Sequence, residues 1–172
     1  MRLLFEMDKK DYADCARRFV RNSARSVVIA DKKVAMIYSK KYGYYKFPGG
    51  GIEAGEDPVD AMIRETREEA GLVIKSESIR EYGIVHRIQK SDNDPAECFV
   101  QDNYYYLCTA EAEAVSQDLQ GYEAEEGYKL VYVAPHVAIE KNRNLGKTPY
   151  SPTMFEREAR VLEMLIDEGH FD

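Results

Sequence analysis

The chain has 172 residues, which is enough for one folded domain with a buried core. Hydrophobic residues make up 44% of the sequence and aromatic residues 11%, a composition that excludes an intrinsically disordered chain. The formal net charge is −7, so we do not expect binding to a nucleic-acid polymer. An anionic ligand would therefore need a metal ion or a few well-placed cations.

The sequence has no repeat, no low-complexity tract and no linker, so we expect a single domain over residues 1–172. No run approaches the roughly 18 apolar residues of a membrane span. The three cysteines lack the spacing of a zinc site or a disulfide framework. We expect a cytoplasmic protein with no membrane partner, and a homodimer is compatible with the sequence.

Runs rich in Val, Ile and Tyr predict the strands. In chain order they are Arg25–Ala30, Val34–Ser39, Ile84–Ile88, Tyr104–Ala110 and Lys129–Val133. The segment SVVIADKKVAMIYS (Ser26–Ser39), which covers nearly all of the first two, predicts a hairpin that turns at Asp31–Lys33.

Two segments have apolar residues at helical spacing. Asp57–Ala70 is the first, with Asp57 as its N-cap and Gly71 as its terminator. The second lies in SPTMFEREARVLEMLIDEG and begins at Ser151 or Thr153. Strands and helices mixed in this way predict an α/β fold, with helices on the faces of a central mixed β-sheet.

The first helix concentrates negative charge. Glu65, Glu68 and Glu69 lie at i, i+3 and i+4 and share one face, where like charges cost about 0.2–0.5 kcal/mol per pair. One interpretation is a solvated acidic surface, and the other is a site for a divalent cation, because carboxylates are hard oxygen ligands. The preceding run of glycines at positions 49–51 favours the second, since bare backbone can approach a ligand closely.

Residues 50–72 read GGIEAGEDPVDAMIRETREEAGL. This segment resembles the Nudix box, GX5EX7REUXEEXGU, in which U is an aliphatic residue. Every fixed position matches except the first U, which is Thr66. The resemblance implies a Nudix-like α/β/α sandwich that hydrolyses a nucleoside diphosphate linked to another group, with Mg²⁺ or Mn²⁺ as cofactor.

The resemblance also implies residue roles, carried over by position. Glu65, Glu68 and Glu69 become metal ligands, and the carbonyl of Gly49 is an additional one. Glu65 and Glu68 are thereby catalytic residues, and Glu65 is one candidate for the general base. Arg64 is implied to orient the carboxylates of the helix through an ion pair.

Members of the family often recruit a further glutamate from a distant loop, as base or metal ligand. The segment QGYEAEEGYKLVYVAP offers Glu123, Glu125 and Glu126 just before a strand. We favour Glu126, because it lies closest to that strand. The alternative is a solvent-exposed acidic loop.

Substrate recognition is less constrained by the sequence. An aromatic platform for a base contributes about 1–3 kcal/mol by stacking, and Tyr44 and Tyr104 are candidates. Alternation along the strand puts Tyr105 on the sheet face opposite to Tyr104. Lys46 and Arg87 are candidates for phosphate contacts. The alternatives are core packing for the tyrosines and plain solvent exposure for the cations.

These features predict a metal-dependent pyrophosphohydrolase whose substrate is a small nucleotide-like molecule, such as a nucleoside triphosphate or a nucleotide sugar. One alternative is a non-catalytic nucleotide sensor, although such proteins usually lose glutamates of the box. Another is an isomerase of isoprenoid diphosphates, for which Cys98 is the nearest candidate nucleophile. For the hydrolase, Glu69→Gln should reduce activity by orders of magnitude and leave folding intact or slightly improved, because it relieves unfavourable electrostatics on the helix.

Overall fold

The computed structural model describes residues 1–172. The strands are β1 (Leu3–Asp8), β2 (Arg17–Val20), β3 (Ser23–Ala30), β4 (Lys33–Ser39), β5 (Tyr45–Lys46), β6 (Gly49–Gly51), β7 (Arg80–Lys90), β8 (Glu97–Cys108) and β9 (Tyr128–Val133). The helices are α1 (Pro58–Ala70), α2 (Tyr122–Glu126), α3 (Pro135–Arg143) and α4 (Pro152–Asp167), with a short 3₁₀ turn at Ser76–Ser78. None of the helices is long and apolar enough to cross a bilayer.

The strands form one mixed sheet, as the sequence predicts. Its central order is β1-β7-β8-β3-β4-β5, and β2, β6 and β9 add to β8, β3 and β4. The β1–β7, β2–β8 and β3–β8 pairs are parallel, whereas the β7–β8 and β3–β4 pairs are antiparallel. The β3–β4 hairpin turns at Asp31 and Lys32, whose φ angles of 49° and 59° suit a tight two-residue turn.

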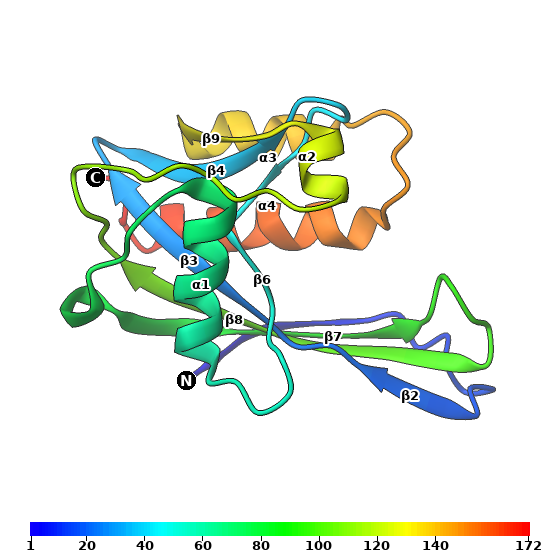
Figure 1. Ribbon diagram of the computed structural model, residues 1–172. Helices are drawn as coiled ribbons and strands as arrows, with labels where there is room; N and C mark the ends of the chain where they lie inside the picture. Colours follow the sequence, from blue (N-terminus) through cyan, green and yellow to red (C-terminus); the bar gives the residue numbers. More distant parts are fainter.

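Helices cover both faces of the sheet (Figure 1). On one face, α1 contributes Ala61 and Met62 to a core cluster that includes Tyr106 of β8. On the other, α4 contributes Val161 and Leu162 to a second cluster. The predicted α/β/α sandwich is therefore confirmed. Alternation along β8 is also confirmed, because Tyr105 belongs to the second cluster and lies away from its neighbour Tyr106.

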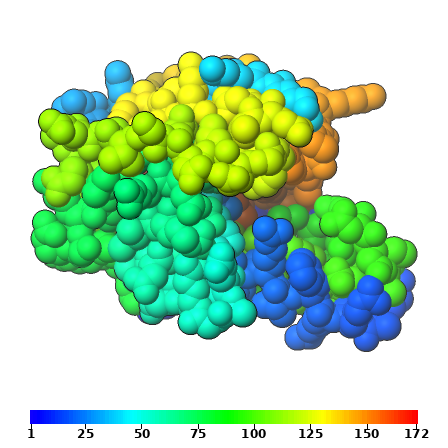
Figure 2. Space-filling model, viewed as in Figure 1, coloured from blue at the N-terminus to red at the C-terminus, as the bar shows by residue number.

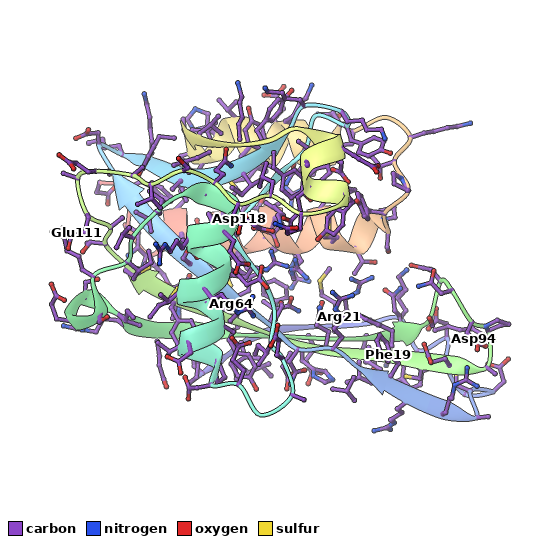
Figure 3. The ribbon with its side chains drawn as sticks, viewed as in Figure 1. Phe19, Arg21, Arg64, Asp94, Glu111 and Asp118 are labelled. Carbon is purple, nitrogen blue, oxygen red and sulfur yellow. The ribbon has the colours of Figure 1, made fainter.

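A ribbon made of β2, β8 and the end of β7 projects away from the helices (Figure 1). β2 and β3 act as one interrupted strand along β8, because Arg17–Val20 pairs with residues 97–100 and residues 23–28 pair with residues 103–108 in the same register. Figure 2 shows a recess between this ribbon, in blue and green, and the region around α2, in yellow-green. Phe19 and Arg21 lie next to one another along the ribbon (Figure 3).

Helix α1 forms where the sequence predicts it. The side chain of Asp57 accepts a hydrogen bond from Val59 N, and Gly71 ends the helix with a left-handed φ of 67°. Thr66, the departure from the box, is fully buried and donates its hydroxyl hydrogen to Ser26 Oγ at 2.9 Å. A polar pair thus replaces an aliphatic contact between α1 and β3.

Candidate active site

The loop before α1 brings its backbone against the helix carboxylates, and glycine is required there. Gly49 has a φ of 133°, and a Cβ atom at this position would collide with the carbonyl oxygen of Ala24 on β3. A Cβ atom at Gly50 would collide with the carboxylate of Glu65. The glycines therefore let β6 lie directly beside both β3 and the acidic face of α1.

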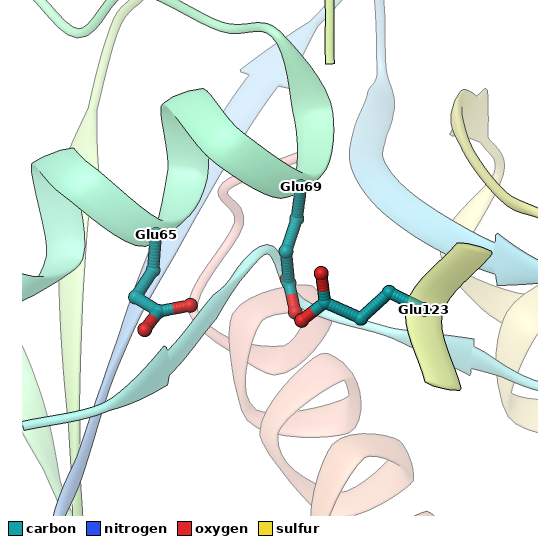
Figure 4. Close-up of side chains that lie close together, drawn as sticks. All are labelled: Glu65, Glu69 and Glu123. Atoms are coloured by element: carbon teal, nitrogen blue, oxygen red, sulfur yellow. The ribbon is translucent and has the colours of Figure 1, made fainter. Parts of the chain in front are cut away.

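Three carboxylates from two helices converge beside this loop. Glu65 and Glu69 lie one turn apart on α1, and Glu123 reaches them from α2 (Figure 4). One oxygen atom of each lies within 4.8 Å of the other two. Burial, followed by the charges of Glu69 and Glu65, raises the pKa of Glu123. Negative charge gathered in this way favours a bound cation.

Two basic side chains contact the glycine loop beside the cluster, and one of them also contacts a clustered carboxylate. Lys46 Nζ lies 2.5 Å from Glu69 Oε1 and 3.5 Å from the carbonyl oxygen of Gly49, and both side chains of this ion pair are almost fully buried. Arg25 Nη1 donates to the same Gly49 carbonyl at 2.8 Å. The other oxygen of Glu69 accepts a hydrogen bond from Gly49 N at 3.1 Å. The ion pair and the hydrogen bonds of Glu69 thus hold the glycine loop against α1.

Arg64 forms ion pairs with Glu56 and Glu65, as its position in the box implies. Its Nε and Nη2 atoms donate to the two oxygens of Glu56, each at 2.9 Å, and Nη1 donates to Glu65 Oε1 at 2.7 Å. Hydrogen bonds from Arg64 are the main cause that lowers the pKa of Glu56 to about 2. The Glu56 carboxylate is therefore held ionised at neutral pH, and the hydrogen bonds from Arg64 orient both side chains.

A cleft of about 330 Å³ leads away from the glycine loop along the projecting ribbon. It is lined by residues of β2, β3, β7 and β8 and by Met154 and Arg157 near the start of α4. Arg21, Arg25 and Arg87 lie there together with aromatic side chains from β2 and β8, Phe19 and Phe99. In a chain of net charge −7, this concentration of arginines marks the cleft as a site for an anion.

The structure brings together most of the predicted site residues. Glu65 and Glu69 share the carboxylate cluster, Arg64 contacts Glu65, and Lys46 lies against Glu69. Gly49, Lys46 and Arg87 line the cleft. The Gly49 carbonyl oxygen, the additional metal ligand implied by the resemblance, already accepts hydrogen bonds from Arg25 Nη1 and Lys46 Nζ. A metal ion could bind this oxygen only if Lys46 moved away.

Two predicted carboxylates lie outside the cluster. Glu68 has a side chain that is 40% exposed, and its one ion pair is with Arg64, at 3.5 Å. Glu126 is buried away from the cluster, and its carboxylate accepts hydrogen bonds from Ser39 Oγ, Tyr44 OH and Tyr150 OH. The preference for Glu126 is therefore corrected in favour of Glu123, which occupies the opposite end of the one-turn helix α2.

The two predicted aromatic contacts are also corrected. Tyr44 is fully buried, and its hydroxyl group is used by Glu126 and Tyr128. Tyr104 packs on the α1 side of the sheet, against the core cluster that contains Tyr106. Neither ring lines the cleft, because core packing, the alternative that we gave for these tyrosines, holds for both.

An ion pair inside the core was not predicted. Arg157 and Glu158 of α4 are almost completely buried, with Arg157 Nη2 at 2.6 Å from Glu158 Oε1. Glu158 Oε2 accepts a hydrogen bond from Phe47 N at 2.7 Å, which fixes the chain just before the glycine loop. A sequence signal existed, since Glu158 falls at the same helical spacing as the apolar residues Phe155 and Leu162.

Comparison with known proteins gives a consistent result. The NUDIX domain family matches residues 19–153. The chain is 31% identical over 90 residues to an RNA pyrophosphohydrolase of Acinetobacter baylyi, covering 47% of this chain and 54% of that protein. It is 30% identical over 103 residues to an RNA pyrophosphohydrolase of Vibrio cholerae, covering 55% and 59%. The chain thus spans little more than half the length of these relatives.

Solved structures share the fold at low identity. The MutT protein of Bacillus halodurans aligns with a TM-score of 0.57 at 20% identity, over 83% of this chain and 82% of that one. A NUDIX hydrolase of Nitrosomonas europaea aligns with a TM-score of 0.56 at 16% identity, over 88% and 89%. At these identities the likeness extends to the arrangement of the sheet and helices.

Proposed function

Because the chain belongs to the NUDIX family, we propose that it hydrolyses a pyrophosphate bond in a nucleoside diphosphate linked to another group. The observation that carries this proposal is the convergence of the Glu65, Glu69 and Glu123 carboxylates at the mouth of an arginine-lined cleft. A pyrophosphate and a divalent cation can meet at such a junction, because one side supplies oxygen ligands and the other supplies cations. We also propose that residues 1–172 act as one domain.

The residues present fit a bound Mg²⁺ or Mn²⁺ ion. The three clustered groups are carboxylates, which are the ligands these hard cations prefer. The clustered carboxylates also favour a nearby positive charge, and Lys46 supplies one to Glu69. We propose Glu65, Glu69 and Glu123 as the ligands. A bound divalent ion would neutralise phosphate charge and lower the pKa of a water molecule.

The other side chains at the junction orient the ligands and the substrate. Arg64 holds Glu65 in place, and Arg25 fixes the Gly49 carbonyl. Arg21 and Arg25 line the cleft next to the glycine loop, where they can pair with phosphate oxygens. We propose Glu65 or Glu123 as the group that accepts the proton of the attacking water, because both are ionisable carboxylates of the cluster.

A nucleotide fits the composition of the cleft. Phe19, Phe99, Tyr122 and Tyr150 line it together with the arginines, so a base can stack while phosphates pair with cations. The relatives are named RNA pyrophosphohydrolases, which adds the 5′ end of RNA to the candidate substrates despite the expectation from net charge. We keep a small nucleotide-like molecule as the proposed substrate, in a protein without a membrane partner.

The two alternatives have less support. A non-catalytic sensor is disfavoured because the carboxylates of the box are present and two of them join a cluster. An isoprenoid diphosphate isomerase would need a nucleophile in the cleft. Cys98 is buried and lies on the face of β8 opposite to Phe99, so it does not reach the cleft.

Purified protein incubated with a panel of nucleoside triphosphates, nucleotide sugars and dinucleoside polyphosphates tests the proposal. We expect turnover with Mg²⁺ or Mn²⁺, with cleavage within the pyrophosphate, and complete loss in excess EDTA. Products are identified by chromatography and phosphorus NMR. Binding of nucleotides without any turnover in either metal would instead support the sensor.

A further inference from the structure

Arg87 is a buried cation at the far end of the cleft. It lies on β7 and is only 7% exposed, yet it lines the same cleft as the glycine loop. Alternation and the β7–β8 register place Arg87 opposite Gln101, on the sheet face that carries Phe99. Its guanidinium carbon lies 5.2 Å from the centre of the Phe99 ring. Packing therefore holds the guanidinium group in one place.

No carboxylate forms an ion pair with Arg87. The hydrogen bonds from its Nε and Nη2 atoms, at 3.1 and 2.9 Å, both go to the neutral side-chain oxygen of Gln89. Nη1 makes no hydrogen bond to the protein and is not enclosed by it. By contrast, Arg157, which is also buried on this side of the sheet, is paired with Glu158, and the buried Arg25 donates to the carbonyl oxygens of Phe47 and Gly49 in the glycine loop. Arg87 therefore keeps a buried charge without a carboxylate partner, and its hydrogen bonds to side chains all go to one neutral amide.

The surroundings add to this imbalance. Burial, followed by the positive charge of Arg157, lowers the pKa of Arg87 to about 10, and Asp92 offsets this only in part. Burying a cation without a counter-charge is costly, so an anion at this position would recover much of that cost. A guanidinium with free donors on a rigid support is well suited to a phosphate group.

We propose that Arg87 forms a subsite for a second phosphate group of the substrate, separate from the pyrophosphate held beside Glu65 and Glu69. The inference rests on the proposed function. Arg87 lies three strand spacings of about 4.8 Å each from the glycine loop, across β3 and β8. A nucleoside can lie across that span, with its base against aromatic side chains of the cleft. The preferred substrate is thus a nucleoside polyphosphate that carries a further phosphate on its ribose.

A matched pair of ligands tests this assignment. Binding is measured by calorimetry with the α,β-methylene analogue of ATP and with the same analogue carrying a 3′-phosphate. The wild-type protein should bind the second at least about tenfold more tightly, the effect of one charge-assisted hydrogen-bond pair. A third ligand, the triphosphorylated dinucleotide with a 3′-phosphodiester, separates the two sources of such a phosphate. Preference for the diester indicates an RNA 5′ end, and preference for the monoester indicates a free nucleotide.

Two variants and one control test whether Arg87 causes the preference for the analogue with a 3′-phosphate. Arg87→Gln removes the charge, and Gln89→Glu supplies the carboxylate that the site lacks; each should reduce the preference to about twofold or less. Gln89→Glu also keeps the inference testable if Arg87→Gln does not fold. Arg18→Gln is the control, because Arg18 is exposed on β2 and, by alternation, points to the opposite face from Phe19. It should retain the full preference.

Equal binding of the two analogues by the wild-type protein would overturn the subsite, as would a preference that persists in both Arg87→Gln and Gln89→Glu. Parallel hydrolysis assays with ATP distinguish failure of the Arg87 subsite from failure of the proposed hydrolase function. Turnover of ATP without a phosphate preference removes the subsite only. A phosphate preference without turnover of any nucleotide removes the hydrolase activity only.

Discussion

Substitution of Glu69 by Gln is expected to reduce kcat/KM by about 10²–10³-fold, because a divalent cation bound to the proposed ligands would stabilise the transition state by several kcal/mol and Glu69 is one of the three clustered carboxylates. The same variant should be less stable than the wild type. Glu69 is 1% exposed and forms a buried ion pair with Lys46. Removal of one partner leaves the other charge buried and costs about 3–5 kcal/mol.

This expectation reverses the one drawn from the sequence. Repulsion between carboxylates on α1 predicted that neutralising Glu69 would leave folding intact or improve it. The buried contact with Lys46 outweighs that repulsion, because exposed like-charge pairs cost only about 0.2–0.5 kcal/mol. The double variant Glu69→Gln/Lys46→Met separates the two effects.

In the double variant, chemical denaturation should show most of the stability regained, whereas hydrolysis assays should show activity still reduced by about 10²–10³-fold. Recovery of activity together with stability would mean that Glu69 acts only through its ion pair with Lys46. Full turnover by Glu69→Gln alone would remove it from the catalytic centre.

Glu123 and Glu126, both on α2, should differ when substituted: the first change should lower activity, and the second should lower stability. Glu123→Gln is expected to reduce kcat by about a hundredfold or more and to leave stability unchanged or raised, because the lost charge is repelled by Glu65 and Glu69. Glu126→Gln is expected to lower the free energy of unfolding by about 1.5–3 kcal/mol, because hydroxyl hydrogen bonds to a buried carboxylate are weakened. Activity per folded molecule should persist.

Glu125→Gln provides the matched control, since Glu125 lies on the same short helix and is exposed. It should change neither property. Steady-state kinetics and urea denaturation of the three variants provide the measurements. Loss of activity in Glu126→Gln with full activity in Glu123→Gln would restore the assignment made from the sequence and remove Glu123 from the cluster's function.

The parts of the site that are local in sequence were predictable. The glycine loop, the N-cap Asp57 and the spacing of Glu65 and Glu69 all lie within one segment, so their mutual arrangement follows from helix geometry. The role of Arg64 was implied by the resemblance to the Nudix box, and its ion pairs agree with that role. The main strands were also predictable, because their apolar runs are long and are bounded by turn residues.

The parts that depend on distant pairing were not predictable. The cleft needs β2 and β3 to share one register along β8, which no local pattern reveals. Helix α3 was missed because its buried side includes Asn142, a polar residue. The amide of Asn142 pairs with the backbone N and O of Tyr45, each at 2.8 Å, so its burial is explained only by β5. Likewise, the choice of Glu123 over Glu126 depends on which end of α2 meets α1.

Crystals grown with Mn²⁺ offer the most direct test of the central claim, that the clustered carboxylates hold a divalent cation at the mouth of the cleft. Anomalous difference density collected near the manganese absorption edge should show a peak coordinated by oxygens of Glu65, Glu69 and Glu123, with Lys46 displaced from Glu69. The peak should be absent from crystals of Glu69→Gln. Manganese bound elsewhere, or no peak while Lys46 keeps its contact with Glu69, would contradict the account.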